Sequence, residues 1–183
     1  RHSSSAASDV YKRQSKPIAA ASIAQVYSAE LKENNREVVL KVVRPGIKKI
    51  IKRDISLMRR IALYAEKISG DAKRLQLLAL VEEYESVILS ELDMRIEASN
   101  IKQTKRNFSE SKLLYVPEAY LDLCTENLLV MEKIEGIPVD RLEILNSMGV
   151  NLKLVAERGV EIFLKQVFID NFFHADMLSL IHI

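Results

Sequence analysis

The sequence has 183 residues, 48% of them hydrophobic, and its 27 Lys and Arg nearly balance 25 Asp and Glu, for a formal net charge of +2. This composition is typical of one ordinary folded domain and excludes a disordered body. The single cysteine, Cys124, excludes an internal disulfide framework. The near-neutral charge, without a platform of basic and aromatic residues, argues against nucleic-acid binding. No apolar run is long enough to cross a bilayer.

The two ends differ in composition from the middle. Residues 1–14 are rich in Ser and Ala without periodicity, and residues 178–183 (LSLIHI) follow a patterned segment abruptly. We interpret both ends as non-native tails and leave them out of the fold prediction, as is done for tags. Two frayed termini are the alternative interpretation.

The first part of the body has the pattern of strands. Residues 18–31 contain small residues and then an alternating stretch, and residues 32–36 (KENNR) are a polar turn, which predicts strand, turn and strand. Residues 37–43 (EVVLKVV) are a β-branched run that ends before Pro45 and Gly46. This run predicts a buried strand with one lysine, Lys41, inside it.

Helical patterns follow. From residue 47 apolar residues recur every three or four positions among many Lys and Arg, which predicts an amphipathic basic helix. A second helical pattern runs from about residue 75 to residue 108, acidic at its centre and free of Gly and Pro. It predicts one long helix.

The remaining body returns to strands and ends in helices. Residues 116–123 and 127–134 predict two strands, residues 140–148 a short helix, and residues 152–173 a longer helix buried on more than one face. The order of strands, helices, strands and helices favours a two-lobed α+β architecture over a doubly wound parallel sheet.

Lys41 is the first residue that could carry chemistry. An unpaired buried ammonium is costly, so Lys41 either extends to solvent from an edge strand or binds nucleotide phosphates while a helix carboxylate holds it. The candidate carboxylates are Glu91, Asp93 and Glu97. Asp93 and Glu97, four residues apart, would face one side of the predicted helix and Glu91 another. A solvated acidic face balanced by Arg95 is the alternative.

Two short patterns are also compatible with phosphate chemistry. The first is a run of four small residues: Ala19, Ala20, Ala21 and Ser22. Small residues let backbone N–H groups approach a phosphate, although Ala resists the positive φ that Gly permits, and a tight packing segment is the alternative. The second is His174 and Asp176 after an apolar helix, where Asp can serve as base or positioning group, or where the helix simply ends.

Taken together, these residues resemble the UbiB family of atypical protein-kinase-like proteins, also called the AarF or ADCK family, over roughly residues 16–177. Five blocks carry the resemblance: PIAAASIAQVY (17–27), VVLKVVRPGI (38–47), ELDMRIEASN (91–100), LLVMEKIEG (128–136) and FFHADM (172–177). The resemblance implies a protein-kinase-like small lobe of antiparallel strands and long helices over residues 15–135. The start of a truncated helical large lobe is implied over residues 136–177.

The same resemblance implies a nucleotide site for ATP or ADP with Mg²⁺. The small-residue run takes the place of the glycine-rich loop of ordinary kinases, and Lys41 contacts the α- and β-phosphates. Glu91 and Asp93 match an ExD motif, and Glu97 lies in an EA element. Either glutamate could pair with Lys41, so the choice between them stays open.

Further positions complete the implied site. Met131 falls at the gatekeeper position, and the Glu132 carbonyl and Ile134 amide are the implied backbone contacts to adenine. Asp176 matches the catalytic aspartate, and His174 precedes it in the same motif.

The sequence also departs from the family pattern. The family continues past its catalytic aspartate with a His-Pro-Gly-Asn type stretch and an Asp-Phe-Gly motif, whose Asn and Asp bind metal, and it carries an N-terminal KxGQ motif. This sequence contains neither, so we expect no metal ligand and little or no turnover from this chain. The parent protein is expected to be an ATP-dependent atypical kinase or ATPase that supports ubiquinone biosynthesis with other quinone-biosynthesis proteins, in the cytoplasm and peripheral to the inner membrane.

Two other functions are compatible with parts of the sequence. A nucleotide-binding pseudokinase or lipid-associated scaffold could use the basic helix on an anionic or isoprenoid lipid surface, although a solvated cationic face is the simpler reading. The six cations concerned are Lys48, Lys49, Lys52, Arg53, Arg59 and Arg60. A small-molecule kinase of the aminoglycoside or choline phosphotransferase type also carries the His-x-Asp pattern, but the ELDMRIEASN block argues against it.

Overall fold

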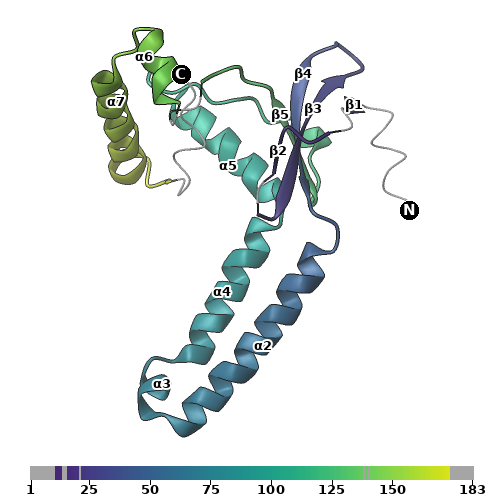
Figure 1. The fold of residues 1–183 in the computed structure, drawn as a ribbon, viewed down its shortest axis with the longest axis vertical. Coiled ribbons are helices and arrows are strands. Elements are labelled where there is room, and N and C mark those ends of the chain that lie inside the picture. Colours follow the sequence, from purple (N-terminus) through teal and green to yellow (C-terminus); the bar gives the residue numbers. More distant parts are fainter. Residues whose placement is uncertain (1–10, 14–15, 21, 138, 140, 174–183) are drawn as a thin grey trace. The chain divides into compact units, whose positions relative to one another are not determined.

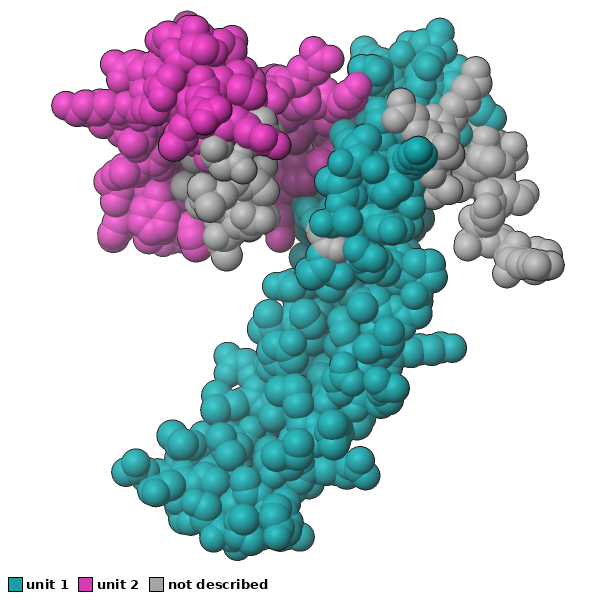
Figure 2. All heavy atoms as spheres, in the orientation of Figure 1, with its two compact units in different colours: residues 1–98, 120–130 teal, residues 99–119, 131–183 magenta. Residues whose placement is uncertain are grey.

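The computed structural model describes residues 11–13, 16–20, 22–137, 139 and 141–173. Two compact units make up the chain (Figure 2). The first consists of Arg1–Ala98 and Tyr120–Val130, and the second of Ser99–Ala119 and Met131–Ile183. The boundary between a small and a large lobe, which the sequence puts between residues 135 and 136, stays a prediction.

The first unit contains a sheet (Figure 1). Its strands are β1 (Tyr11–Arg13), β2 (Ala19–Ala20), β3 (Ala24–Leu31), β4 (Glu37–Val43) and β5 (Leu128–Glu132). The order is β1-β3-β4-β5, and β2 also pairs with β3. Strand β3 pairs antiparallel with β1, β2 and β4, so the predicted strand, turn and strand are confirmed. Strand β1 lies within the segment that we interpreted as a tail.

The two faces of the sheet carry different residues, because successive side chains of a strand alternate between faces. One face carries a core cluster that includes Tyr27 of β3, Leu40 of β4 and Val130 of β5, with Leu40 and Val130 fully buried. Lys41, next to Leu40, therefore lies on the opposite face. The alternation thus puts Leu40 in the core and leaves Lys41 outside it, available to bind a ligand.

A helical hairpin follows β4 in the first unit (Figure 1). It consists of α2 (Ile47–Ile68), α3 (Gly70–Arg74) and α4 (Leu77–Glu91). Gly46, with a φ of 79°, makes the left-handed turn that starts α2 directly after Pro45. Helices α2 and α4 pack through Ile55, Ala62 and Val81. The predicted basic amphipathic helix is thus confirmed.

The single long helix predicted over residues 75–108 is wrong, because the chain breaks at Leu92 and Asp93 into α4 and α5 (Met94–Asn107). Asp93 is the residue before α5, and its Oδ1 accepts a hydrogen bond from the Arg95 amide at 3.0 Å. Asp competes with the helix for backbone donors and favours this N-cap position. Asp93 therefore lies at the start of a helix, and not in the interior of one as we expected.

The strand predicted over residues 116–123 is also wrong. Only Ala119 forms an isolated bridge, with Met131, and Leu121–Leu123 form a 3-10 turn, η1. Pro117 has no N–H to donate to a ladder, which disfavours a regular strand. The strand predicted over residues 127–134 is confirmed in its central part as β5.

The second unit contains the last helices. These are α6 (Leu142–Ser147), α7 (Leu152–Leu164) and a π-helical turn, η2 (Lys165–Ile169). The observed helix α7 is therefore shorter than the helix predicted over residues 152–173. Burial on more than one face is wrong for these residues, since Ile162 is buried while Val160 is 58% exposed and Phe168 74%. Among the described residues, no helix is both long enough and apolar enough to cross a membrane.

Candidate functional site

The clearest functional feature of the first unit is an ion pair between β4 and α5. The Lys41 Nζ donates to both carboxylate oxygens of Glu97, at 2.7 Å to Oε1 and 2.8 Å to Oε2. The two side chains are 24% and 28% exposed, so the pair is largely but not completely removed from solvent. The structure thus pairs Lys41 with Glu97, a choice that the sequence left open.

Pairing with Glu97 does not exhaust the donors of Lys41. An ammonium has three N–H groups, and Glu97 accepts two of them. Its partial exposure leaves a path for an anion in solution. A lysine held in this way is positioned to contact a phosphate without first having to lose side-chain freedom.

The small-residue run lies on the same part of the sheet as Lys41. Val26 of β3 is registered with Lys41 on one side and with Ala19 of β2 on the other. Residues in one registered row point to one face of a sheet, so Ala19, Val26 and Lys41 share a face. The run and the lysine are therefore separated by one strand.

Alanine suits the conformation of this run. Ala19 and Ala20 form the short exposed strand β2, and Ser22 is exposed too. In the described part of the chain, the non-glycine residues with positive φ are Asn35, Gln76 and Asn171, none of which belongs to the run. The described alanines thus adopt backbone conformations that do not require glycine. Ala21 lies outside the described residues.

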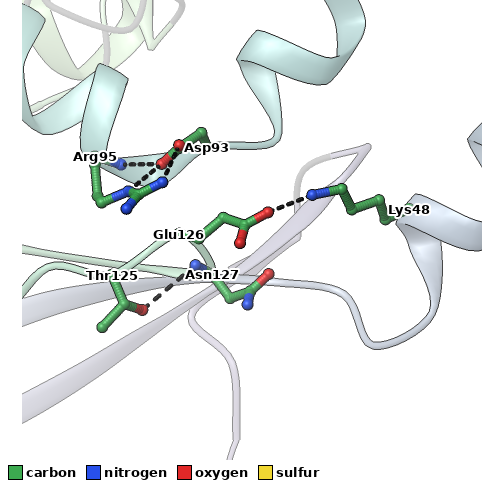
Figure 3. Close-up of polar contacts among 6 residues, drawn as sticks. All are labelled: Lys48, Asp93, Arg95, Thr125, Glu126 and Asn127. Carbon is green, nitrogen blue, oxygen red and sulfur yellow. Dashed lines mark hydrogen bonds and ion pairs between the residues drawn. The ribbon is translucent and has the colours of Figure 1, made fainter.

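The first turn of α5, which carries Glu97, is anchored at several points (Figure 3). The Met94 amide donates to the Glu126 carbonyl at 3.0 Å, and Met94 is fully buried. Arg95 donates through Nε and Nη2 to the two oxygens of Asp93, at 2.9 and 2.6 Å. These contacts hold the turn from which Glu97 reaches Lys41.

Lys48, at the start of α2, forms an ion pair with Glu126, in the turn before β5 (Figure 3). The pair of Lys48 with Glu126 lies beside the pair of Asp93 with Arg95 (Figure 3). The four residues form a cluster of charges of alternating sign. No local pattern predicts the contact between Lys48 and Glu126, because the two residues are 78 positions apart along the chain.

Asp93 and Glu91, the other two candidate partners of Lys41, have different positions. Asp93 binds Arg95, as the alternative of a balanced acidic segment proposed, and it caps α5. Glu91 is exposed at the last residue of α4. The expectation that Asp93 and Glu97 face one side is wrong, because Asp93 precedes the helix on which Glu97 lies.

The bond between Asp93 and Arg95 predicts a pH-dependent contribution to stability. The Arg95 side chain, which donates to the carboxylate, holds the pKa of Asp93 below its usual value. Because the unfolded pKa is about 3.9, this contribution is fully present above about pH 5 and is lost as the pH falls through the lower folded pKa. We expect Asp93→Asn to lower the urea midpoint near neutral pH but to match wild type at acidic pH. A difference that does not change with pH would contradict this prediction.

The residues expected to contact adenine belong to the second unit. The Glu132 amide donates to the Glu118 carbonyl at 2.8 Å. Its carboxylate accepts from the Tyr115 hydroxyl at 2.8 Å and from the Glu118 amide at 3.0 Å. Met131 bridges Ala119, and Ile134 follows the end of β5. The end of β5 is thus held by the segment around Glu118.

The two residues expected to act in catalysis, His174 and Asp176, lie outside the described residues. Within the described part of the chain, no group of three His, Cys, Asp or Glu side chains could hold a metal ion.

Comparison with known proteins gives a family for this fold. Residues 3–179 match the ABC1 atypical kinase-like domain. A protein of Erwinia tasmaniensis named "Probable protein kinase UbiB" is 52% identical over 161 residues, which are 88% of this chain and 30% of that protein. Proteins of the same name from Yersinia pestis and Yersinia pseudotuberculosis are 53% identical over 163 residues, 89% of this chain and 30% of theirs. The chain thus spans about 30% of the length of these relatives.

The match agrees with the architecture. The antiparallel strands, the helices that follow them and the ion pair of Lys41 with Glu97 have the arrangement of a kinase-like small lobe. The expected α+β, kinase-like fold is confirmed. The chain belongs to the ABC1 atypical kinase-like family.

Proposed function

We propose that this chain carries the nucleotide-binding part of a UbiB-type atypical kinase or ATPase, with ATP or ADP as the ligand. The observation that supports the proposal is the ion pair between strand lysine Lys41 and helix glutamate Glu97. In protein kinases a strand lysine paired with a helix glutamate contacts the nucleotide phosphates, and the pair has to be in place for activity.

Each partner of the pair has a separate task in this proposal. Lys41 places a positive charge where the α- and β-phosphates bind, and charge-assisted hydrogen bonds of this kind are among the strongest in proteins. Glu97 orients the ammonium and compensates its charge when no nucleotide is bound. Residues 19–22 supply small side chains beside the phosphates, so that backbone N–H groups can approach. Mg²⁺ would accompany the nucleotide.

The wider role follows from the relatives. They are named as probable protein kinases of the UbiB type, and the family resemblance connects that type with ubiquinone biosynthesis. We propose the same pathway, and partners among the quinone-biosynthesis proteins, for the whole protein from which this sequence comes. A location at the periphery of the inner membrane goes with that proposal.

Calorimetric titration of the purified chain with ADP, and separately with ATP, tests the proposal. We expect wild type to bind, and Lys41→Met to weaken binding at least about tenfold, because a charged hydrogen bond contributes roughly 1.5–3 kcal/mol. Lys49→Met is the matched control, since Lys49 is an exposed lysine of α2 and should bind like wild type. Equal affinity of wild type and Lys41→Met, or no binding by a wild-type chain with a cooperative thermal transition, would contradict the proposal.

A further inference from the structure

Helix α2 carries large apolar side chains on the side that is turned away from α4. Five of them are between 48% and 68% exposed: Ile50, Leu57, Ile61, Tyr64 and Ile68. At 3.6 residues per turn, they lie roughly 180–240° around α2 from Ile55, which is buried between α2 and α4. They therefore form one stripe, about 27 Å long, that α4 does not cover. We call these five residues the α2 stripe.

Basic side chains border the α2 stripe along one edge. Lys49, Arg53, Arg60 and Lys67 are exposed. Measured in the same direction, they lie roughly 120–160° around α2 from Ile55, directly beside the stripe. We call these four residues the basic edge. The acid that borders the stripe, Asp54, lies with its Oδ1 3.6 Å from the Nε of Arg53, so it is balanced by a member of that edge.

The structure thus sorts the cations that the sequence suggested for lipid binding. Lys48, Lys52 and Arg59 lie only roughly 20–60° around α2 from Ile55, on the side nearer α4. Lys48 and Arg59 already form ion pairs, with Glu126 and Glu85. The cations left beside the apolar side chains are those of the basic edge.

An exposed apolar stripe with a basic edge is typical of a helix that lies in the interface of an anionic membrane. Monomeric proteins expose single apolar side chains freely but rarely a contiguous set, so the α2 stripe is a candidate binding surface. Lys and Arg can leave their apolar stems on the stripe and extend their charges to lipid phosphates. The charge of the basic edge is therefore complementary to such a surface.

The other charges of the hairpin are compatible with this partner. Helix α4 carries four Glu, but it packs on the side of α2 away from the stripe. Packed helices are roughly 8–10 Å apart, and charges in solution are screened over about 8 Å at physiological salt, so these Glu repel the lipid only weakly. A second copy of α2 fits less well, because this helix has seven Lys or Arg and only two acids.

We propose that the α2 stripe and the basic edge bind the surface of an anionic lipid bilayer, with α2 lying in the plane of the interface. The apolar side chains enter the interface, and the basic edge contacts lipid phosphates. The inference deepens the proposed function, since it rests on the location at the membrane periphery and names the surface that makes the contact. It does not rest on nucleotide binding.

Sedimentation with vesicles of phosphatidylglycerol, and separately of phosphatidylcholine, tests the proposal. We expect the wild-type chain to sediment only with phosphatidylglycerol, and Ile61→Glu to weaken binding at least about tenfold, because it puts a carboxylate into the interface. Val160→Glu is the matched control on α7, because Val160 is 58% exposed and Ile61 60%. Equal binding to both kinds of vesicle, or no effect of Ile61→Glu, overturns the proposal. A folded wild-type monomer that stays in the supernatant leaves the stripe to a protein partner and overturns it too.

Removing charges tests the role of the basic edge. The double variant Arg53→Gln with Arg60→Gln should bind phosphatidylglycerol vesicles at least about tenfold more weakly, because each cation near an anionic surface contributes to binding. The control is Lys153→Gln with Arg158→Gln, which removes the same two charges from exposed positions of α7. Equal losses in the two double variants would show unspecific attraction and contradict the proposal.

Two further measurements separate this proposal from its alternatives. Sedimentation velocity without vesicles should show a wild-type monomer, and an oligomer that Ile61→Glu dissociates would identify a second copy as the occupant and overturn the proposal. The vesicle experiments contain no nucleotide, and Ile61→Glu should bind ADP like wild type. Loss of vesicle binding with intact ADP binding therefore counts against the lipid surface alone, and the reverse counts against the nucleotide site alone.

Discussion

Replacing Glu97 by Lys is expected to destabilise the first unit by about 2 kcal/mol and to abolish nucleotide binding. The substitution puts a second cation beside Lys41, whose Nζ now lies 2.7 Å from a carboxylate oxygen. Removing one partner of a fully buried ion pair costs about 3–5 kcal/mol, and the partial exposure of this pair reduces that cost. Urea unfolding followed by circular dichroism measures the stability, and calorimetric titration with ADP measures the binding.

Glu91→Lys is the matched control for this substitution. Glu91 is a glutamate of the same sequence block, but it is exposed at the end of α4. It should change stability by less than about 0.5 kcal/mol, as is usual for surface positions. Exchanging the charges in the double variant Lys41→Glu with Glu97→Lys should recover part of the stability but none of the binding. Equal effects of the substitutions at Glu91 and Glu97 would contradict the assignment.

Replacing Leu40 by Ala is expected to destabilise the first unit by about 2–5 kcal/mol, the range for a large-to-small substitution in a packed core. Leu40 is fully buried in the cluster that joins β3, β4 and β5, so the removed methyl groups leave a cavity. The midpoint of urea unfolding at neutral pH measures the loss.

Leu142→Ala serves as control, because Leu142 is 53% exposed on α6 and its removal should cost little. The comparison also tests which face of the sheet is the core. A loss of less than about 1 kcal/mol in Leu40→Ala would contradict the packing described for that face.

The residues around Lys41 show what the sequence could predict. A lysine inside a run of Val and Leu requires an anionic partner, and this local argument leads to Lys41 without any structure. The strands β3 and β4 and the helix α2 were predictable for the same reason, because their periodicities are local. The alternation of the strand also separates Leu40 from Lys41.

The partner of Lys41 could not be predicted in this way. It depends on the rotation of α5 about its axis, and that rotation is set where the helix starts at Asp93. A continuous helix across Asp93 would have put Asp93 and Glu97 on one side. The preference of Asp for N-cap positions is a signal that could have suggested the break. The anchoring of the turn by Glu126 and Lys48 joins distant segments, and no local pattern indicates it.

Labelling with an acyl-phosphate derivative of ATP tests the central claim most directly. Such a probe transfers its acyl group to a lysine amine that lies beside the bound phosphates, and peptide mass spectrometry identifies the labelled lysine. The proposed function predicts acylation of Lys41 that excess ATP suppresses, with only weak, ATP-insensitive labelling of exposed lysines such as Lys49 and Lys52. Labelling spread over exposed lysines, with Lys41 unmodified or unaffected by ATP, would contradict the claim that Lys41 and Glu97 form a nucleotide site.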